Sequence, residues 1–220
     1  AAIKEYILNQ ITEHRASRKV NYYYNTWGMQ RDSQWENMEL RDIFNEKRIL
    51  EEIDYASDLN IDMFVLDDGW QETMGIWTPS KTKLPNGINP LIERMKSHNI
   101  VPGVWLSLMG IDSTTTRYKE HTDWVVRDAK GIPIAAQWDH PAFDMVSNFY
   151  NLIKDDHKKM IDMGFRFFKW DAINTLNSYQ PNLNHGDSTY SKKEIIDRYN
   201  YLLPFYVVRL MRELREYNPD

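Results

Sequence analysis

Acidic side chains end two apolar runs of this sequence, where a parallel α/β barrel would assemble its chemistry. Asp67 and Asp68 follow one run, and Asp171 ends a later run at 165–171. In such a barrel the carboxyl ends of the strands form the rim of the active site. We therefore interpret Asp171 as a nucleophile and the Asp67-Asp68 pair as part of the same rim.

A lysine two positions before Asp171 strengthens that interpretation. Side chains alternate along a strand, so Lys169 and Asp171 point to one face and Trp170 to the other. A neighbouring ammonium group favours the ionised carboxylate that a nucleophile needs. A purely structural ion pair at the strand end is the alternative. A glycosyl intermediate would also require a second carboxyl group about 5 to 5.5 Å away, and the sequence does not place one.

The segment Asp67-Asp68-Gly69-Trp70 offers a second kind of contact. Adjacent carboxylates suit paired hydrogen bonds to neighbouring sugar hydroxyls, Gly69 permits a sharp turn, and Trp70 offers a flat apolar wall. An aspartate that caps a helix or completes a turn is the alternative. Two other tryptophans, at or near the ends of apolar runs, could also line a pocket, although core packing is the more frequent role of a lone tryptophan. They are Trp27 and Trp105.

The elements that must position these residues alternate along the chain. Four apolar runs predict buried parallel strands, at 20–25, 61–67, 101–108 and 165–171. Helical periodicity lies between and after them. The predicted helix boundaries are a stop at Asn60, an N-cap at Asn89 before Pro90, a cap at Ser147, an end at Gly164, a Ser191–Glu194 capping box and a kink or break at Pro204.

This alternation predicts an α/β fold, a partial (β/α)8 TIM barrel of about four βα units with a preceding N-terminal helix at 3–13. Long loops at 110–145 and 172–190 take up the remaining length. We expect residues 1–220 to form a single domain, the N-terminal portion of a larger catalytic barrel. The first and last strands would be open edges, which favour a homo-oligomer.

Composition narrows the class of partner. The 220 residues carry a net charge of -5 and no dense basic run, which argues against nucleic acid and against a polybasic membrane anchor. No apolar run reaches the roughly 18 residues of a membrane helix. With no cysteine, and histidines that lack ligand spacing, we expect no metal site and no cofactor. Small neutral or polar ligands remain open.

Several short motifs, in order, are similar to those of glycoside hydrolase family 36, the α-galactosidase and raffinose-synthase-like family. The resemblance covers about residues 20–175. The motifs are Asn25-Thr26-Trp27-Gly28, Phe64 to Trp70, Leu84-Pro85-Asn86-Gly87, Gly103-Val104-Trp105-Leu106, Glu120 to Val125 and Lys169-Trp170-Asp171.

The resemblance implies a (β/α)8 domain that cleaves terminal α-galactosides with retention of configuration and without a metal. By motif, Asp171 resembles the nucleophile, Lys169 a galactose-binding lysine, and Asp67 and Asp68 the acids that hold the O4 and O6 side. Trp27 and Trp105 resemble pocket walls. The family's general acid is an aspartate after the sixth strand, which we expect to lie outside these residues, leaving the 220 residues alone inactive.

Two departures concern the sugar and the leaving-group side. Many members have Trp-Phe-Glu-Pro-Glu after the third strand, where this chain has Trp105-Leu106-Ser107-Leu108-Met109, and a usual loop arginine has no counterpart in 131–137. We predict a retaining α-galactosidase-like glycosidase. An α-galactosyl transglycosylase, a non-catalytic carbohydrate-binding half barrel and a metal-dependent enzyme using Asp67, Asp68 and Asp171 are the alternatives.

Overall fold

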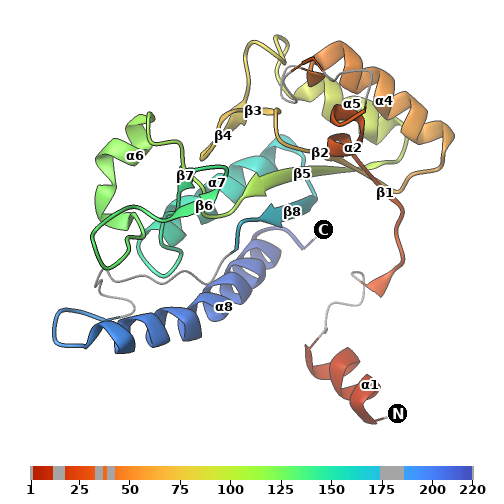
Figure 1. Cartoon of the computed structure of the whole chain (residues 1–220). Coiled ribbons are helices and arrows are strands. Elements are labelled where there is room, and N and C mark those ends of the chain that lie inside the picture. The colour runs from red at the N-terminus through yellow and green to blue at the C-terminus, as the bar shows by residue number, and fades with distance from the viewer. Residues whose placement is uncertain (1, 12–17, 33–36, 39–42, 174–185, 220) are drawn as a thin grey trace.

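A four-stranded parallel sheet organises the molecule. The computed structural model describes residues 2–11, 18–32, 37–38, 43–173 and 186–219. Its main sheet has the order β1-β2-β5-β8, with every neighbouring pair parallel. The strands are β1 (Tyr23–Asn25), β2 (Met63–Leu66), β5 (Val101–Ser107) and β8 (Phe167–Asp171), shown in Figure 1. The predicted α/β partial barrel is confirmed, and all four predicted strands are present, each of them shorter than the sequence suggested.

Helices cover one face of this sheet. The strand side chains that point toward the helices are therefore apolar. Tyr24 of β1 stacks on Phe64 of β2 at 4.9 Å between ring centroids, and the Tyr24 hydroxyl donates to Glu52 of α4, which places this pair on the helix-facing side. Helix α4 packs against α5, and α7 against α8. Their bounds are α4 (Glu46–Asp58), α5 (Asn89–Ser97), α7 (Phe149–Met163) and α8 (Lys192–Tyr217).

Local chemistry explains where most of these helices begin and end. Ser191 and Glu194 form the predicted capping box of α8. Gly164 ends α7 in the left-handed region, with φ 112°, as predicted. After α4, Leu59 is the C-cap and Asn60 follows with φ 54°. Pro204 lies inside α8 without interrupting it, so the predicted break is absent.

Two predicted caps are wrong by one position. Ile88 is the N-cap of α5, and Asn89 is already the first helical residue, with no side-chain cap bond. Asn148 is the N-cap of α7, although the Ser147 hydroxyl still accepts a hydrogen bond from Phe149 N at 3.1 Å. The Ser147 side chain therefore still satisfies a backbone N–H at the start of α7, although Ser147 lies one residue before the N-cap.

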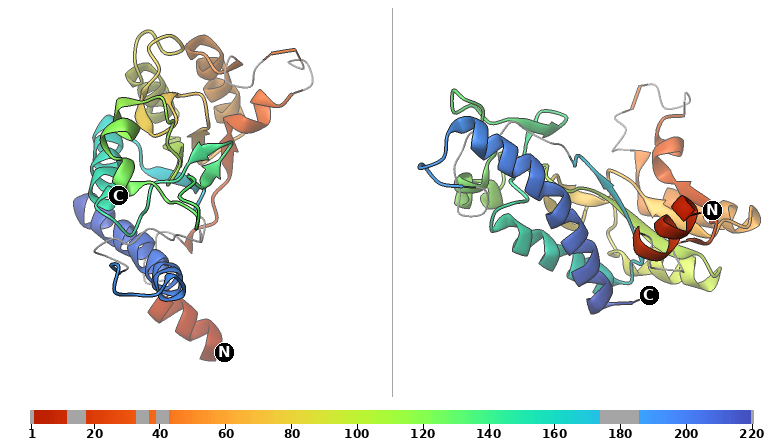
Figure 2. Two further views of the ribbon diagram at one scale, coloured as in Figure 1. Left: turned by 60° about the vertical axis from the view of Figure 1, so that its left-hand side comes forward. Right: turned by 90° about the horizontal axis from the view of Figure 1, so that it is seen from below.

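The first helical segment stands apart from this body. It comprises α1 (Ala2–Tyr6) and a π-helical turn, η1 (Ile7–Ile11). Helix α1 buries no side chain, and it lies away from the sheet in Figure 1 and in the left view of Figure 2. Residues 12 and 13 of the predicted helix, and residues 174–185 of the fourth loop, lie outside the described residues.

Short elements that the sequence suggested only as loops lie around the carboxyl ends of the strands. Two antiparallel hairpins form there, β3–β4 and β6–β7. The additional elements are α2 (Thr26–Gln30), β3 (Gln71–Thr73), β4 (Ile76–Pro79), α6 (Thr116–Glu120), a 3-10 turn η4 (Thr122–Trp124), β6 (Ala135–Gln137) and β7 (His140–Pro141).

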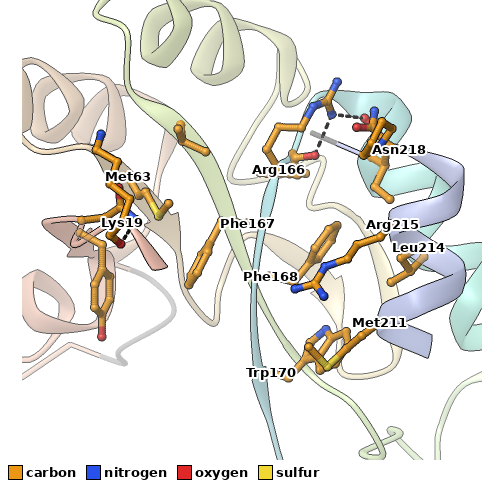
Figure 3. A pocket seen from close by; sticks show the side chains of 16 residues that line it. Lys19, Met63, Arg166, Phe167, Phe168, Trp170, Met211, Leu214, Arg215 and Asn218 are labelled. Carbon is orange, nitrogen blue, oxygen red and sulfur yellow. Dashed lines mark hydrogen bonds between the residues drawn. The ribbon is translucent and has the colours of Figure 1, made fainter. Parts of the chain in front are cut away.

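A cavity of about 670 Å³ follows the outer edge of β8 (Figure 3). Phe167 lines it from one face of the strand, while Phe168 and Trp170 line it from the other and face Met211 of α8. Side chains from both faces can line one cavity because β8 is an edge of the described sheet, as β1 is at the other side. The predicted association through these edges, and the single domain, stay predictions.

Candidate active site

An ion pair joins the carboxyl ends of β2 and β8, which are about a hundred residues apart in sequence. Lys169 Nζ lies 2.7 Å from Asp67 Oδ2. Lys169 pairs in register with Trp105, and Asp171 with Ser107, so Lys169 and Asp171 share one face as predicted. The ion pair of the lysine is nevertheless with Asp67, the acid of another strand. The choice between a structural pair and a ligand-binding one is not decided by this contact, so the role of Lys169 stays a prediction.

Asp171 is exposed, and neutral N–H groups hold its carboxylate. Oδ2 accepts hydrogen bonds from Gln137 Nε2 at 2.9 Å and from Trp105 Nε1 at 3.4 Å. Oδ1 accepts one from the backbone N–H of Ala172 at 2.9 Å. Ala172 has φ 54°, a conformation costly for a residue with a Cβ. The carboxylate is thus oriented from three sides and still reaches solvent.

Asp67 and Asp68 lie in the opposite environment, with 3% and 2% of their surface exposed. Asp67 N donates to the Thr26 hydroxyl at 2.9 Å, and Gln30 Nε2 donates to Asp68 O at 2.7 Å. The Asp68 carboxylate accepts from Gln71 Nε2 at 2.5 Å. Helix α2 and strand β3 therefore clamp this turn, and both acids have protein partners.

The turn after Asp68 explains its glycine and its tryptophan. Gly69 has φ 118°, and a Cβ there would lie 3.0 Å from Phe44 Cβ, which supports the predicted sharp turn. Trp70 is fully buried, and its Nε1 donates to Trp105 O at 2.8 Å. Its ring packs against Phe165 in the core. Trp70 therefore has no exposed surface in this structure, and its role as a ligand wall stays a prediction.

The other two candidate tryptophans meet a third that the sequence did not single out. Trp138 packs on Trp27 at 6.0 Å and on Trp105 at 5.8 Å between centroids. Trp105 is 1% exposed, Trp27 is half-buried, and Trp138 is 48% exposed. The three indoles form a row beside Asp171. The most buried of them, Trp105, also donates a hydrogen bond to the Asp171 carboxylate.

Gln137 and Trp138 are the site residues that sequence reasoning missed. They lie at the tip of the β6–β7 hairpin, which Figure 1 shows beside the ends of β5 and β8. Trp138 and Asp139 have φ 47° and 62°, both in the left-handed region. A two-residue turn of this kind is usually signalled by Asn-Gly or Asp-Gly. Trp138-Asp139 carries no such signal.

A buried histidine supports the β8 end from the helix-facing side. His157 of α7 is fully buried, its Nδ1 lies 2.6 Å from Ile153 O, and its Nε2 accepts from Trp170 Nε1 at 2.8 Å. Burial lowers the pKa of His157 to about 4. The neutral ring, with Nδ1–H donating, fits both partners and fixes the position of Trp170, which lies between Lys169 and Asp171.

Neither a metal site nor a membrane-spanning helix occurs within residues 2–11, 18–32, 37–38, 43–173 and 186–219. No group of three or more His, Asp or Glu side chains there is placed to hold a metal ion, so Asp67, Asp68 and Asp171 do not form one. None of the helices in this part of the chain is long and apolar enough to cross a membrane.

Known sequences resemble this chain over part of their length. The α-galactosidase 2 of Pediococcus pentosaceus is 32% identical over 100 residues, 42% of this chain and 14% of that protein. An α-galactosidase of Lactobacillus acidophilus is 30% identical over 145 residues, 60% of this chain and 19% of that protein. The matched region is therefore a minor part of either relative.

Solved structures and a family model extend the likeness to most of the chain. An α-galactosidase from Lactobacillus brevis has a TM-score of 0.69 at 22% identity, covering 94% of this chain and 27% of its own. A GH36 α-galactosidase from Geobacillus stearothermophilus, in complex with 1-deoxygalactonojirimycin, has a TM-score of 0.67 at 20% identity, covering 92% and 27%. These likenesses show the fold. The family model described as Melibiase matches residues 30–220, and the chain belongs to that family.

Proposed function

We propose that this chain carries the nucleophile and the galactosyl-binding side of a retaining α-galactosidase site. One observation carries the proposal: Asp171 is exposed at the carboxyl end of β8, oriented by N–H donors, on the same strand face as the Lys169–Asp67 ion pair. Membership of the Melibiase family supports it, as do relatives named α-galactosidases.

The proposed chemistry uses Asp171 as the attacking group. A carboxylate oxygen bonds to the anomeric carbon, the bond from that carbon to the leaving oxygen breaks, and a general acid protonates the leaving oxygen. Water then attacks the anomeric carbon from the opposite side, gives a proton to the now deprotonated general acid and releases the carboxylate, so that the configuration is retained. Asp171 suits the first role because it is the solvent-exposed acid of the described strand ends.

The remaining rim residues would bind the sugar. An ammonium group has three N–H donors, and Lys169 directs one of them to Asp67, so two remain for sugar hydroxyls. Carboxylates accept several hydrogen bonds each, so Asp67 and Asp68 can accept from hydroxyls beside their protein donors. Trp27 and Trp105 would bound the pocket. In this proposal a small α-galactoside is the ligand, and no metal takes part.

We further propose that the general acid is not one of these 220 residues. The described sheet has four strands, and the family resemblance expects that acid after a sixth. A protein made of these 220 residues alone should then bind galactose or melibiose without hydrolysing an aryl α-galactoside. Calorimetry and a release assay on the same sample test this, and hydrolysis at an enzyme-like rate would contradict it.

The nucleophile itself is tested in the protein at its full natural length. Asp171→Gly should abolish release of the aryl group, and added azide should restore release because it fits the space that the carboxylate leaves. The product of rescue should be a β-galactosyl azide, whose inverted configuration shows attack from the nucleophile's side. Undiminished release without azide would refute the assignment. Product analysis with an added acceptor sugar separates hydrolysis from transglycosylation.

A further inference from the structure

We propose that the β6–β7 hairpin positions the nucleophile, with Gln137 as the positioning residue that directs one carboxylate oxygen of Asp171 toward the sugar. This inference rests on the proposed function, because it assigns work to Gln137 only if Asp171 attacks. It begins from the hydrogen bond between Gln137 Nε2 and Asp171 Oδ2, 2.9 Å long and formed across 34 residues of sequence.

Chemistry fixes which way the Gln137 amide points. An ionised carboxylate only accepts hydrogen bonds, so the NH2 group must face Asp171, and the opposite orientation would set two acceptor oxygens against each other. This leaves Gln137 Oε1 buried, with no hydrogen-bond partner among the residues that the structure describes. A buried acceptor beside the nucleophile is complementary to a hydroxyl of a bound sugar.

The two carboxylate oxygens of Asp171 differ in the number of hydrogen bonds that they accept. Oδ2 accepts from Gln137 and from Trp105, while Oδ1 accepts only from Ala172 N among the described groups. Each carboxylate oxygen offers about two lone-pair sites. Gln137 and Trp105 together occupy those of Oδ2, so Oδ1 keeps a lone pair to form the new bond to the anomeric carbon.

The hairpin holds Gln137 in place through the neighbouring indole. Trp138 and Asp139 both have left-handed φ values, which L-residues adopt at a cost. Packing of Trp138 on Trp27 and Trp105 offsets that cost. Trp105 is also the second donor to Oδ2. Trp138 thus links the two side chains that orient the carboxylate, Gln137 as its chain neighbour and Trp105 through ring packing.

The charged groups near the Asp171 carboxylate determine how a substitution of Gln137 would alter its electrostatic environment. Lys169 lies on the same face of β8 and is paired with Asp67 of the β2 end. Asp139 and His140 are the titratable groups of the hairpin tip and of β7. Both donors to Oδ2 are neutral, so exchanging Gln137 for an acid adds a negative charge where an N–H now points.

The experiment compares three substitutions in the protein at its full natural length, with an aryl α-galactoside as substrate. Gln137→Met keeps the volume and removes the donor, and Gln137→Glu replaces the donor with an acidic acceptor. Lys130→Gln, an exposed change in the same long loop, is the matched control. Asp171→Ala measures the proposed function independently, and circular dichroism with thermal unfolding checks that each variant is folded.

We expect Gln137→Met and Gln137→Glu to lower kcat/KM by about tenfold to a hundredfold, the loss typical of one hydrogen bond to a charged group. Gln137→Glu should also move the acidic limb of the pH–rate profile upward by on the order of one pH unit, because a like charge opposes ionisation of the nucleophile. Gln137→Met should move it less, and Lys130→Gln should change neither quantity.

Two results would overturn the inference while leaving the proposed function intact. In the first, Asp171→Ala is inactive but Gln137→Met has the kcat/KM of the parent. In the second, Gln137→Glu and Gln137→Met lose activity equally and neither moves the acidic limb, which indicates a purely structural hairpin. Activity retained in Asp171→Ala is a separate outcome, since it removes the proposed function and this inference with it.

Discussion

Two strand ends of this molecule carry acids in similar sequence contexts and surround them differently. At the β2 end, Asp67 and Asp68 are 3% and 2% exposed and are held by α2, β3 and Lys169. At the β8 end, Asp171 is exposed and receives its donors from a hairpin, from β5 and from its own following residue.

Under the proposed function, the surroundings of each acid, rather than its sequence motif, determine its role. An acid enclosed by fixed donors is a rigid acceptor, suited to holding ligand hydroxyls in one orientation. An acid that is oriented yet exposed can form a bond with a ligand. Lys169 connects the two, because it leaves the strand of the exposed acid and pairs with a buried one. The β2 end therefore also serves as a support for the β8 end.

Exchanging each acid for its amide tests this division most strongly. Asp171→Asn should lower turnover of an α-galactoside by on the order of 10⁴-fold or more, as loss of a nucleophile does. Its free energy of unfolding should stay within about 0.5 kcal/mol, because the residue is exposed. Asp67→Asn should instead lower that free energy by about 2 kcal/mol, since Lys169 loses a charged partner. Urea denaturation and steady-state kinetics measure both, and a reversed pattern would contradict the comparison.

Removing the connecting lysine is the next largest effect. Lys169→Met leaves the buried Asp67 carboxylate without its counter-charge and should lower the free energy of unfolding by about 3 kcal/mol. The matched control is Lys193→Met, whose partner Asp197 lies on exposed helix surface, with side chains 83% and 60% exposed. That change should cost far less, because water screens a pair whose two side chains are both exposed. Equal losses in the two variants, in urea denaturation, would show that the Lys169 pair is an ordinary surface contact.

The pH dependence of stability tests whether His157 supports the β8 end. Its pKa is about 4 in the folded chain and 6.5 for an ordinary histidine. Below pH 6.5 His157 binds a proton in the unfolded chain, whereas in the folded chain it stays neutral until the pH reaches about 4. Stability from this group is therefore complete above 6.5 and is lost as the pH falls toward 4.

Between pH 7 and pH 5 that loss should be about 2 kcal/mol in the free energy of unfolding. His157→Gln should flatten this pH dependence, whatever it does to stability at pH 7, and His140→Gln should preserve it. Urea titrations at the two pH values measure the slopes. An unchanged slope in His157→Gln would mean that this ring does not govern the acid sensitivity of the fold.

Much of the scaffold was predictable because local chemistry decides it. Four apolar runs became the four parallel strands, and the Ser191–Glu194 capping box and Gly164 set helix ends as expected. The caps at Asn89 and Ser147 were misplaced by one residue because a proline or a serine can serve a helix start from neighbouring positions. Neither error moves a strand end.

The site was predictable only where it belongs to the strands. Alternation along β8 correctly placed Lys169 and Asp171 on one face, but the lysine's partner depends on how β2 and β8 approach in space. Gln137 reaches Asp171 from a hairpin whose turn lacks the usual Asn or Gly signal. Trp70, next to two rim acids in sequence, turned into the core because the chain bends at Gly69.

The smallest expected effect concerns the backbone directly after Asp171. Ala172 has φ 54°, and its N–H donates to Asp171 Oδ1. Ala172→Gly removes the left-handed strain but adds freedom to the unfolded chain, so the net gain in stability should be about 0.5 kcal/mol. Turnover should fall a few-fold, by roughly 0.5 to 1 kcal/mol in the activation barrier, because the turn that fixes Oδ1 relaxes.

The matched control for that change is Asn60→Gly at the end of α4, which also has φ 54° and is remote from the site. It should gain similar or smaller stability, since asparagine tolerates this conformation better than alanine, and should leave turnover unchanged. Thermal unfolding and steady-state kinetics on both variants separate strain from function. If Ala172→Gly gains stability at no cost in turnover, the strained turn is incidental. The orientation of Asp171 then depends on Gln137 and Trp105. The β2 and β8 ends would in that case differ only in the side chains that donate hydrogen bonds to their acids.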